Sequence, residues 1–503
     1  METQIKFAYG THPVCLTLDQ LNRHGVIAGA TGTGKTITLK VIAEHLSLAG
    51  VPVFLSDIKG DLASLAEPGN SEGLEERLEK THYSEFEPKS FPVEVWDAFG
   101  EQGVPLRVTV SEMGPILLAK LLGLNETQTG VLNVVFSVAD EKGLLLIDLT
   151  DLRAMLNYVA EHAKELGTTY GTISKASIGV ILRSIVVLEK QGAHRFFAEP
   201  SLEIQDFMRV NNEGLGVINI LNATQLYQSP TLYATVLLGL FGEIFDSLPE
   251  VGDLDKPKLV FFFDEAHVLF DDTPKVLVDK IELMVRLIRS KGVGVYFVTQ
   301  NPMDIPDEIG SQLGNRIQHG LRAFTPKELK VVKAVSQTFR QNPDEAANLE
   351  QIIQELATGQ AVISTLNEDG TPSFAQAAYI YPPLSKLGDV DPQVLLKVIN
   401  QSSLLEKYAE PVDRESAHEQ LNQAMATTQE ELIEKADETQ VEHPSEERIR
   451  ELEAELAKQI KKSQGSSRRT DSNFDRFTKN MMSQVGREIG RAITRSITGM
   501  FKK

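Results

Sequence analysis

The sequence predicts an α/β fold with a mostly parallel sheet, an all-helical insertion and a helical C-terminal extension. Short apolar strand patterns alternate with helical patterns over about 24–62 and again over about 214–366. Five or more such strands, each apolar and connected through helices, are typical of a parallel sheet covered on both faces. Between about 112 and 208 the apolar residues follow helical spacing instead. After about 385 the chain becomes rich in Glu, Gln, Ala and Lys.

The first elements form the order strand, loop, helix, strand. "HGVIAGA" (24–30) is a short apolar strand, and "KTITLKVIAEHLSLAG" (35–50) has helical spacing that ends at Gly50. "VPVFLSDIKGDL" (51–62) is a second apolar strand that ends in acids. This order is expected at the start of a doubly wound sheet.

The remaining elements follow the same logic. Residues 63–110 are mixed, with the strand-like pieces "FPVEVWDA" and "VPLRVTV". Beyond the helical part we expect strands at 214–223, 258–270, 293–302, 315–324 and 359–366, with helices at about 230–247 and 276–292. The chain then divides into 1–110 and 211–385 (two parts of one sheet-containing core), 111–210 (helical insertion), 386–462 (acidic helical or coiled extension) and 463–503 (linker and basic tail).

Composition limits the class of protein. The 503 residues include one cysteine, Cys15, so an internal disulfide is excluded and a reducing compartment is favoured. We find no apolar run of transmembrane length and no signal-peptide pattern, and we predict a cytoplasmic protein. The 70 acidic and 50 basic residues give a net charge of −20, which argues against a basic coat for nucleic acid but leaves a local basic surface open.

"GATGTGKT" (29–36) fits the phosphate-binding pattern G-x-x-x-x-G-K-[ST] between a strand and a helix. In such a loop the backbone N–H groups of Gly29, Ala30, Thr31, Gly32, Thr33 and Gly34 face phosphate oxygens. Lys35 supplies a positive charge for the β- and γ-phosphates, and the Thr36 hydroxyl suits Mg²⁺. The alternative is an ordinary glycine-rich turn. We expect ATP and Mg²⁺ as cofactors.

"FFFDEAH" places two acids at the end of an apolar strand. We assign Asp264 to Mg²⁺ and Glu265 to the attacking water, because hydrolysis needs a base as well as a metal anchor. A strand-end capping pair is the alternative. His267 could couple the site to its surroundings or simply be a packed histidine.

Two further strand ends carry polar residues. "FVTQNP" puts Gln300 after the neighbouring strand, where its amide could sense the γ-phosphate or orient water. Asp57, after the second strand, could sit beside the same metal. The alternatives are an ordinary strand-end polar residue for Gln300 and a turn residue for Asp57.

The ordered set GATGTGKT, SDIKGDL, a helical insertion, FFFDEAH and FVTQNP resembles the HerA/FtsK superfamily of P-loop ATPases, and most closely the bacterial HerA-like YjgR group. The resemblance covers nearly the whole chain. It implies a RecA-like core, a homohexameric ring, ATP hydrolysis and movement along duplex DNA. The 28 residues before Gly29 are too few for the β-barrel that HerA carries there, so we expect no such barrel.

The resemblance also implies an arginine supplied by the neighbouring subunit. Arg286 and Arg289 precede the Gln300 strand, and Arg316 and Arg322 lie in "NRIQHGLR". We favour Arg289 and Arg316, with surface or salt-bridge roles as the alternative. Pore loops that grip DNA could use the scattered basic residues Lys59, Lys175 and Arg183.

The last 36 residues, 468–503, hold nine Lys or Arg and three Asp or Glu. Val485, Ile489, Ile493 and Ile497 recur at steps of four beside a row of arginines, which predicts a basic amphipathic helix. Such a helix could lie on an anionic membrane, touch DNA or dock on a protein, including this chain's own acidic surface.

Four functions stay open at this point. The favoured one is a ring-forming ATPase that translocates DNA or remodels a nucleoprotein. A RecA-like ATPase acting on a protein or at a membrane, without DNA translocation, is the main alternative. A small-molecule kinase has little use for an acid pair that activates water, and a nucleotide-regulated scaffold is the fourth.

Overall fold

A computed structural model describes residues 3–438, apart from 253, 272, 274, 344–347 and 413. Residues 1–423 form one compact unit and residues 424–503 form a second. The described residues of the second unit, 424–438, belong to helix α15 (Ala417–Glu438). The part of the predicted extension after residue 438, the linker and the basic tail lie outside the described residues.

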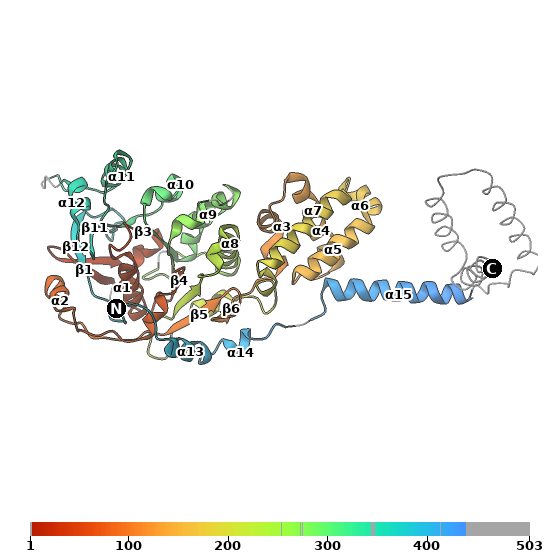
Figure 1. Cartoon of the computed structure of the whole chain (residues 1–503), viewed down its shortest axis with the longest axis horizontal. Coiled ribbons are helices and arrows are strands. Elements are labelled where there is room, and N and C mark those ends of the chain that lie inside the picture. The colour runs from red at the N-terminus through yellow and green to blue at the C-terminus, as the bar shows by residue number, and fades with distance from the viewer. Residues whose placement is uncertain are drawn as a thin grey trace, which may run out of the picture. The chain divides into compact units, whose positions relative to one another are not determined.

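The described chain is built on one 12-stranded sheet (Figure 1). Eight neighbouring strands are parallel, in the sheet order β10 (Asn315–His319), β3 (Gly25–Ala28), β9 (Val293–Thr299), β8 (Leu259–Phe263), β4 (Val53–Asp57), β7 (Ile218–Asn222), β5 (Val93–Asp97) and β6 (Val104–Pro105). Four antiparallel strands extend the β10 side, in the order β11 (Gln360–Ser364), β12 (Gln376–Ile380), β1 (Gln4–Tyr9) and β2 (Pro13–Thr17). The predicted α/β fold with a mostly parallel sheet is confirmed.

Helices cover both faces of the parallel strands. On one face, Val260 and Phe262 of β8 share a core with α1 (Lys35–Leu48). On the other, Phe261 and Phe263 share a core with α8 (Pro230–Ser247), α9 (Lys275–Ile288) and the helices from 110 to 190. Successive side chains of a strand point to opposite faces, so an uninterrupted apolar strand is what two covered faces require.

The segment after β6 contains helices and no strand among its described residues up to 190. The helices are α3 (Val110–Leu121), α4 (Glu126–Lys142), α5 (Leu149–Glu161), α6 (Ala163–Tyr170) and α7 (Lys175–Lys190). Capping boxes fix three of their starts, at Thr109, Asn125 and Asp148, and Gly143 ends α4 in the left-handed conformation. Gly114, with φ of 69°, breaks α3 ahead of Pro115.

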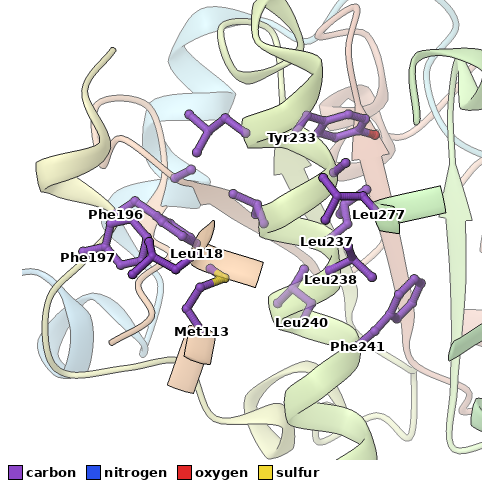
Figure 2. Packing of buried hydrophobic residues seen from close by; sticks show 14 of the residues in the cluster. Met113, Leu118, Phe196, Phe197, Tyr233, Leu237, Leu238, Leu240, Phe241 and Leu277 are labelled. Carbon is purple, nitrogen blue, oxygen red and sulfur yellow. The ribbon is translucent and has the colours of Figure 1, made fainter. Parts of the chain in front are cut away.

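These helices are continuous with the sheet's core. Figure 2 shows Leu237, Leu238 and Phe241 of α8 in the same buried cluster as Met113 and Leu118 of α3. The predicted boundaries around 111–210, like the other domain boundaries, stay a prediction.

The other α-helices before α15 lie between strands of the sheet in the chain or after its last strand. They are α2 (Glu75–Thr81), α10 (Asp307–Gly310), α11 (Pro326–Ser336), α12 (Leu349–Glu355), α13 (Pro392–Asn400) and α14 (Leu405–Tyr408). Tyr408 is fully buried, and its ring lies 5.6 Å from that of Trp96 on β5. The start of the predicted C-terminal extension therefore packs on the sheet-containing core.

Strand prediction failed for four strands. β1, β2 and β12 were not predicted, and "VPLRVTV" contributes only the two residues of β6. β1, β2 and β12 lie in the antiparallel margin of the sheet, where β2 pairs with β1 and β12 pairs with β11. β1 also pairs with β12, which lies near the other end of the compact unit in sequence.

Candidate active site

The phosphate-loop candidate, the acid pair and Gln300 all follow parallel strands and lie at the same edge of the sheet. β9 pairs with β3 on one side and with β8 on the other. The strand that ends before Gln300 therefore separates the loop after β3 from the acids after β8. The predicted strand position of Gln300 is present, and its role stays a prediction.

Loop 29–36 turns tightly between β3 and α1. The φ of Gly29 is 155°, and a Cβ there would lie 2.5 Å from Cβ of His319. Gly34, with φ of 112°, is the N-cap residue of α1, so free N–H groups of the first helical turn adjoin the loop. Thr31 and Gly32 are exposed, and Thr36 is half-buried. The loop thus has the shape and the donors that a phosphate group needs.

Lys35 is the first residue of α1 and is buried. Its Nζ donates to the carbonyl oxygens of Gly29 at 2.7 Å and Ala30 at 3.2 Å. Burial lowers the pKa of Lys35, and the charge of Glu265 opposes this shift. Lys35 therefore lies in the field of the acid pair while its ammonium is held over the loop.

Asp264 is buried, with 2% of its surface exposed. Neither carboxylate oxygen has a hydrogen-bond partner of good geometry among the described residues. Burial raises the pKa of Asp264 to about 6, although the Lys59 ammonium, 3.7 Å from Oδ2, acts in the other direction. A buried carboxylate with free lone pairs fits a divalent cation.

The donors around Asp264 suit Mg²⁺ in particular. In the described part of the chain no group of three His, Cys, Asp or Glu residues could hold a metal by itself. Mg²⁺ commonly binds one or two protein oxygens together with waters and substrate phosphates. Asp264 and the hydroxyl of Thr36 are the residues that would hold it here.

Glu265 is held differently from its neighbour. Its backbone is left-handed, with φ of 48°, which is uncommon for a residue with a side chain and is found most often at functional sites. Oε1 lies 2.7 Å from Nζ of Lys59, and Oε2 accepts a hydrogen bond from Nε2 of Gln300 at 3.3 Å. Burial would raise the pKa of Glu265, but the hydrogen bond and charge of Lys59 outweigh it and lower the pKa.

The two adjacent carboxyl groups thus have pKa values shifted in opposite directions, which is a pattern of sites where two acids have different roles. Nδ1 of His267 lies 3.4 Å from Oε2 of Glu265, so His267 touches the site.

Sequence reasoning missed the place of Lys59. Lys59 follows β4, the strand next to β8, and its side chain is 42% exposed. The pattern offered it as a basic residue for a pore loop, whereas the structure puts its ammonium against the acid pair. Its position two residues after a strand-end aspartate was the signal that could have placed it at this edge.

Asp57 closes the loop after β4. Its Oδ1 accepts from the backbone N–H groups of Lys59 and Gly60, at 3.1 and 2.6 Å, and its Oδ2 accepts from Leu62 at 3.0 Å. Burial raises the pKa of Asp57 to about 6. These bonds favour the interpretation as a turn residue over the predicted contact with the metal.

His319 is a second residue that the sequence did not single out. It ends β10 beneath Gly29. Its Nδ1 is 2.8 Å from the carbonyl of Gln360 and its Nε2 is 2.8 Å from the hydroxyl of Thr38 on α1. Because the carbonyl can only accept, Nδ1 carries the proton and Nε2 accepts from Thr38. Burial lowers the pKa of His319 to about 4, so the ring is neutral and supports the loop from below.

Among the described residues, none of the four candidate arginines is paired with Asp264 or Glu265. Arg316 is half-buried and donates to the carbonyl of Gly310 at 3.0 Å, and Arg322 donates to the carbonyls of Gln354 and Leu356 at the end of α12. Arg286 and Arg289 are exposed, and neither has a hydrogen bond or an ion pair with the described residues. Arg289 precedes β9 by four residues and so lies near the amino edge of the strands, at the far end from Glu265.

Comparison with known proteins gives the family. The family model described as "Helicase HerA-like C-terminal" matches residues 2–503. The chain belongs to this HerA-like family. The predicted relationship to the HerA/FtsK superfamily is therefore confirmed.

Two curated relatives are named DNA double-strand break repair helicase HerA. The protein from Sulfolobus acidocaldarius is 22% identical over 371 residues, and the one from Sulfurisphaera tokodaii is 23% identical over the same length. Each alignment covers 70% of this HerA-like chain and 64% of the relative.

Solved structures to which the chain is similar include the bacterial conjugative coupling protein TrwBdeltaN70 in its unbound monoclinic form and VirB4 of Thermoanaerobacter pseudethanolicus. The first is 14% identical, with a TM-score of 0.49, and the match covers 77% of this chain and 91% of that chain. The second is 13% identical, with a TM-score of 0.47, and the match covers 78% and 99%.

Among the described residues of the HerA-like chain, no single helix is long and apolar enough to cross a membrane. One sharply bent pair, α6 and α7, meets the length and composition criteria only when its two helices are taken together.

Proposed function

We propose that this HerA-like chain hydrolyses ATP with Mg²⁺ and couples hydrolysis to translocation along duplex DNA or to helicase-like remodelling of it. The observation that carries the proposal is the acid pair. Asp264 offers a buried carboxylate without a hydrogen-bond partner of good geometry among the described residues, and Glu265 beside it reaches Gln300, one strand away from a phosphate loop. The names of the curated relatives support DNA as the substrate.

Each residue has a role in this proposal. The N–H groups of loop 29–36 and the Lys35 ammonium bind the phosphates, and Thr36 and Asp264 hold Mg²⁺. When bound there by Thr36 and Asp264, Mg²⁺ would supply positive charge for the phosphoryl oxygens. Glu265 orients the attacking water and accepts its proton, and Gln300 keeps that carboxylate in place through the bond to Oε2.

An arginine from a second copy completes the site in this proposal, in a homohexameric ring. Among the described residues no arginine pairs with Asp264 or Glu265. Arg289 is the better supported candidate, because its guanidinium is exposed and has no hydrogen bond or ion pair with the described residues. The guanidinium of Arg316, in contrast, donates to a carbonyl of its own chain. The position of Arg289, at the far end of the strands from its own acid pair, agrees with a role in the active site of a neighbouring subunit.

Hydrolysis measured with and without linear duplex DNA tests the proposal. Wild type should hydrolyse ATP faster with DNA, and Glu265→Gln should lose about 10³-fold in both conditions, since the base is removed while the shape is kept. Glu308→Gln, at an exposed residue of α10, is the matched control and should behave as wild type.

The outcomes separate the alternatives. Hydrolysis that DNA does not change would favour a RecA-like ATPase acting on a protein or at a membrane, which the net charge of −20 also permits. No hydrolysis by wild type in any condition would refute both ATPase functions. Imaging with ATP tests the ring, and persistent monomers would contradict the arginine in trans.

A further inference from the structure

The Lys59 ammonium lies against both carboxylates of the acid pair. We propose that Lys59 is a positioning residue that competes with Mg²⁺ for Asp264 and Glu265 and holds Glu265 back until the ammonium moves away. This inference rests on the proposed ATP hydrolysis and goes beyond it, because it assigns control of the reaction to a residue outside the phosphate loop and the acid pair.

The backbone around Lys59 is anchored by hydrogen bonds, while its side chain is partly exposed. The Asp57 carboxylate accepts the N–H groups of Lys59, Gly60 and Leu62, and Gly60 turns the loop with φ of 83°. The side chain is 42% exposed. A flexible four-carbon stem on an anchored loop lets the ammonium exchange between the acid pair and solvent.

Charge makes Lys59 and the metal competitors. The ammonium is 2.7 Å from Oε1 of Glu265 and 3.7 Å from Oδ2 of Asp264. The oxygens of Asp264 accept no other well-formed hydrogen bond among the described residues, so they are the ones available to a metal ion. An ammonium and a divalent cation at one buried carboxylate repel each other strongly, because the interior screens charge poorly.

The same contact engages one oxygen of Glu265 and leaves only its remaining lone pairs for a water. Oε1 is taken by Lys59, and Oε2 is taken by Gln300 at 3.3 Å with His267 at 3.4 Å. A base must lie within hydrogen-bond distance of the water whose proton it accepts. While Lys59 holds Oε1, both oxygens have partners. The other nearby ammonium, that of Lys35, donates to the carbonyls of Gly29 and Ala30 instead.

The experiment compares full-length wild type with Lys59→Met, Lys59→Gln and Lys59→Arg. Binding of a fluorescent non-hydrolysable ATP analogue is titrated with Mg²⁺, and steady-state hydrolysis gives kcat and KM. For Lys59→Met and Lys59→Gln we expect half-saturation at about five-fold less Mg²⁺, from the upper range for a partly exposed ion pair. We also expect kcat to rise about five-fold at an unchanged KM for ATP, by the same estimate. Lys59→Arg, which keeps the charge, should stay near wild type.

Lys164→Met is the control, since Lys164 is an exposed lysine on α6 with no part in the site. It should leave the Mg²⁺ titration and the kinetics unchanged. Circular dichroism checks that every variant is folded, and the two neutral variants at position 59 guard against the misfolding of one.

The Mg²⁺ titration and the hydrolysis assay fail independently. An unchanged Mg²⁺ requirement in both neutral variants, or a fall in kcat, would overturn the role of Lys59 while leaving ATP hydrolysis intact. Absence of hydrolysis in wild type together with the five-fold gain in Mg²⁺ affinity would support the competition and refute the proposed reaction. Absence of both would refute both.

Discussion

Replacing Asp264 by Asn should make the folded protein more stable at neutral pH while abolishing hydrolysis. Asn keeps the shape of the side chain and removes its charge. In the folded chain Asp264 is 2% exposed, and burial raises its pKa from 3.8 to about 6. The folded state therefore disfavours the carboxylate that the proposed metal site requires.

The magnitude follows from the difference between the two pKa values. Between pH 3.8 and about 6 the folded protein binds more protons at Asp264 than the unfolded chain does. The free energy of unfolding therefore decreases as the pH rises through this window. About two pKa units correspond to about 3 kcal/mol of stability lost by pH 7.5. An asparagine amide does not titrate in this range, so the variant should avoid this loss.

The assay is urea unfolding of wild type and Asp264→Asn at pH 4 and pH 7.5, with EDTA and without nucleotide, followed by circular dichroism. The two proteins should have nearly equal midpoints at pH 4, and the variant should be more stable at pH 7.5. Asp279→Asn, at an exposed residue of α9, controls for removal of a charge and should show no such pH-dependent gain.

A variant equal to or less stable than wild type at pH 7.5 would refute this account of Asp264. That outcome would mean that contacts of the carboxylate, chiefly with Lys59 at 3.7 Å, outweigh its burial. Retained ATP hydrolysis by a folded variant would refute the assignment of Asp264 to Mg²⁺.

Four other substitutions test separate parts of the structure. Gly29→Ala puts a Cβ 2.5 Å from that of His319 and should cost about 2 kcal/mol of stability as well as weaken nucleotide binding, measured by unfolding and by a fluorescent ATP analogue. Asp57→Ala leaves three backbone N–H groups without their acceptor and should cost about 3 kcal/mol in urea, whereas a stable variant would contradict its role in the turn. Phe261→Ala empties a fully buried site and should cost about 4 kcal/mol, with Phe324→Ala, at a residue that is 87% exposed, as the unaffected control. Arg289→Ala should reduce hydrolysis by about 10³-fold, and mixing it with inactive Lys35→Ala subunits should restore part of the activity only if the arginine acts in trans.

The main site residues could be found from the sequence because strand ends carry a strong local signal. An apolar strand followed by Asp264 and Glu265, or by the loop 29–36, brings polar groups to the carboxyl edge whatever the remainder of the fold. Helix α8 was predicted at 230–247 and spans Pro230–Ser247, since Pro230 and a continuous helical pattern mark it locally.

Residues whose role depends on a distant partner could not be found in this way. Lys59 is one basic residue among 50 in the sequence, and only the pairing of β4 with β8 brings it to Glu265. His319 acquires its place beneath Gly29 through the parallel pairing of β10 with β3. Strands β1 and β12, far apart in the chain, also pair with each other, beside their nearer partners β2 and β11.

The sequence by itself determined the class of fold and the order of the strand-end motifs, because apolar periodicity and short motifs depend on neighbouring residues. The tertiary structure decided which charges meet. It buries Asp264 without a well-formed hydrogen bond to any other described residue, pairs Glu265 with Lys59 and Gln300, and engages Asp57 with its own loop. Contacts of this kind depend on distance through space and on burial, and neither can be read from spacing along a chain.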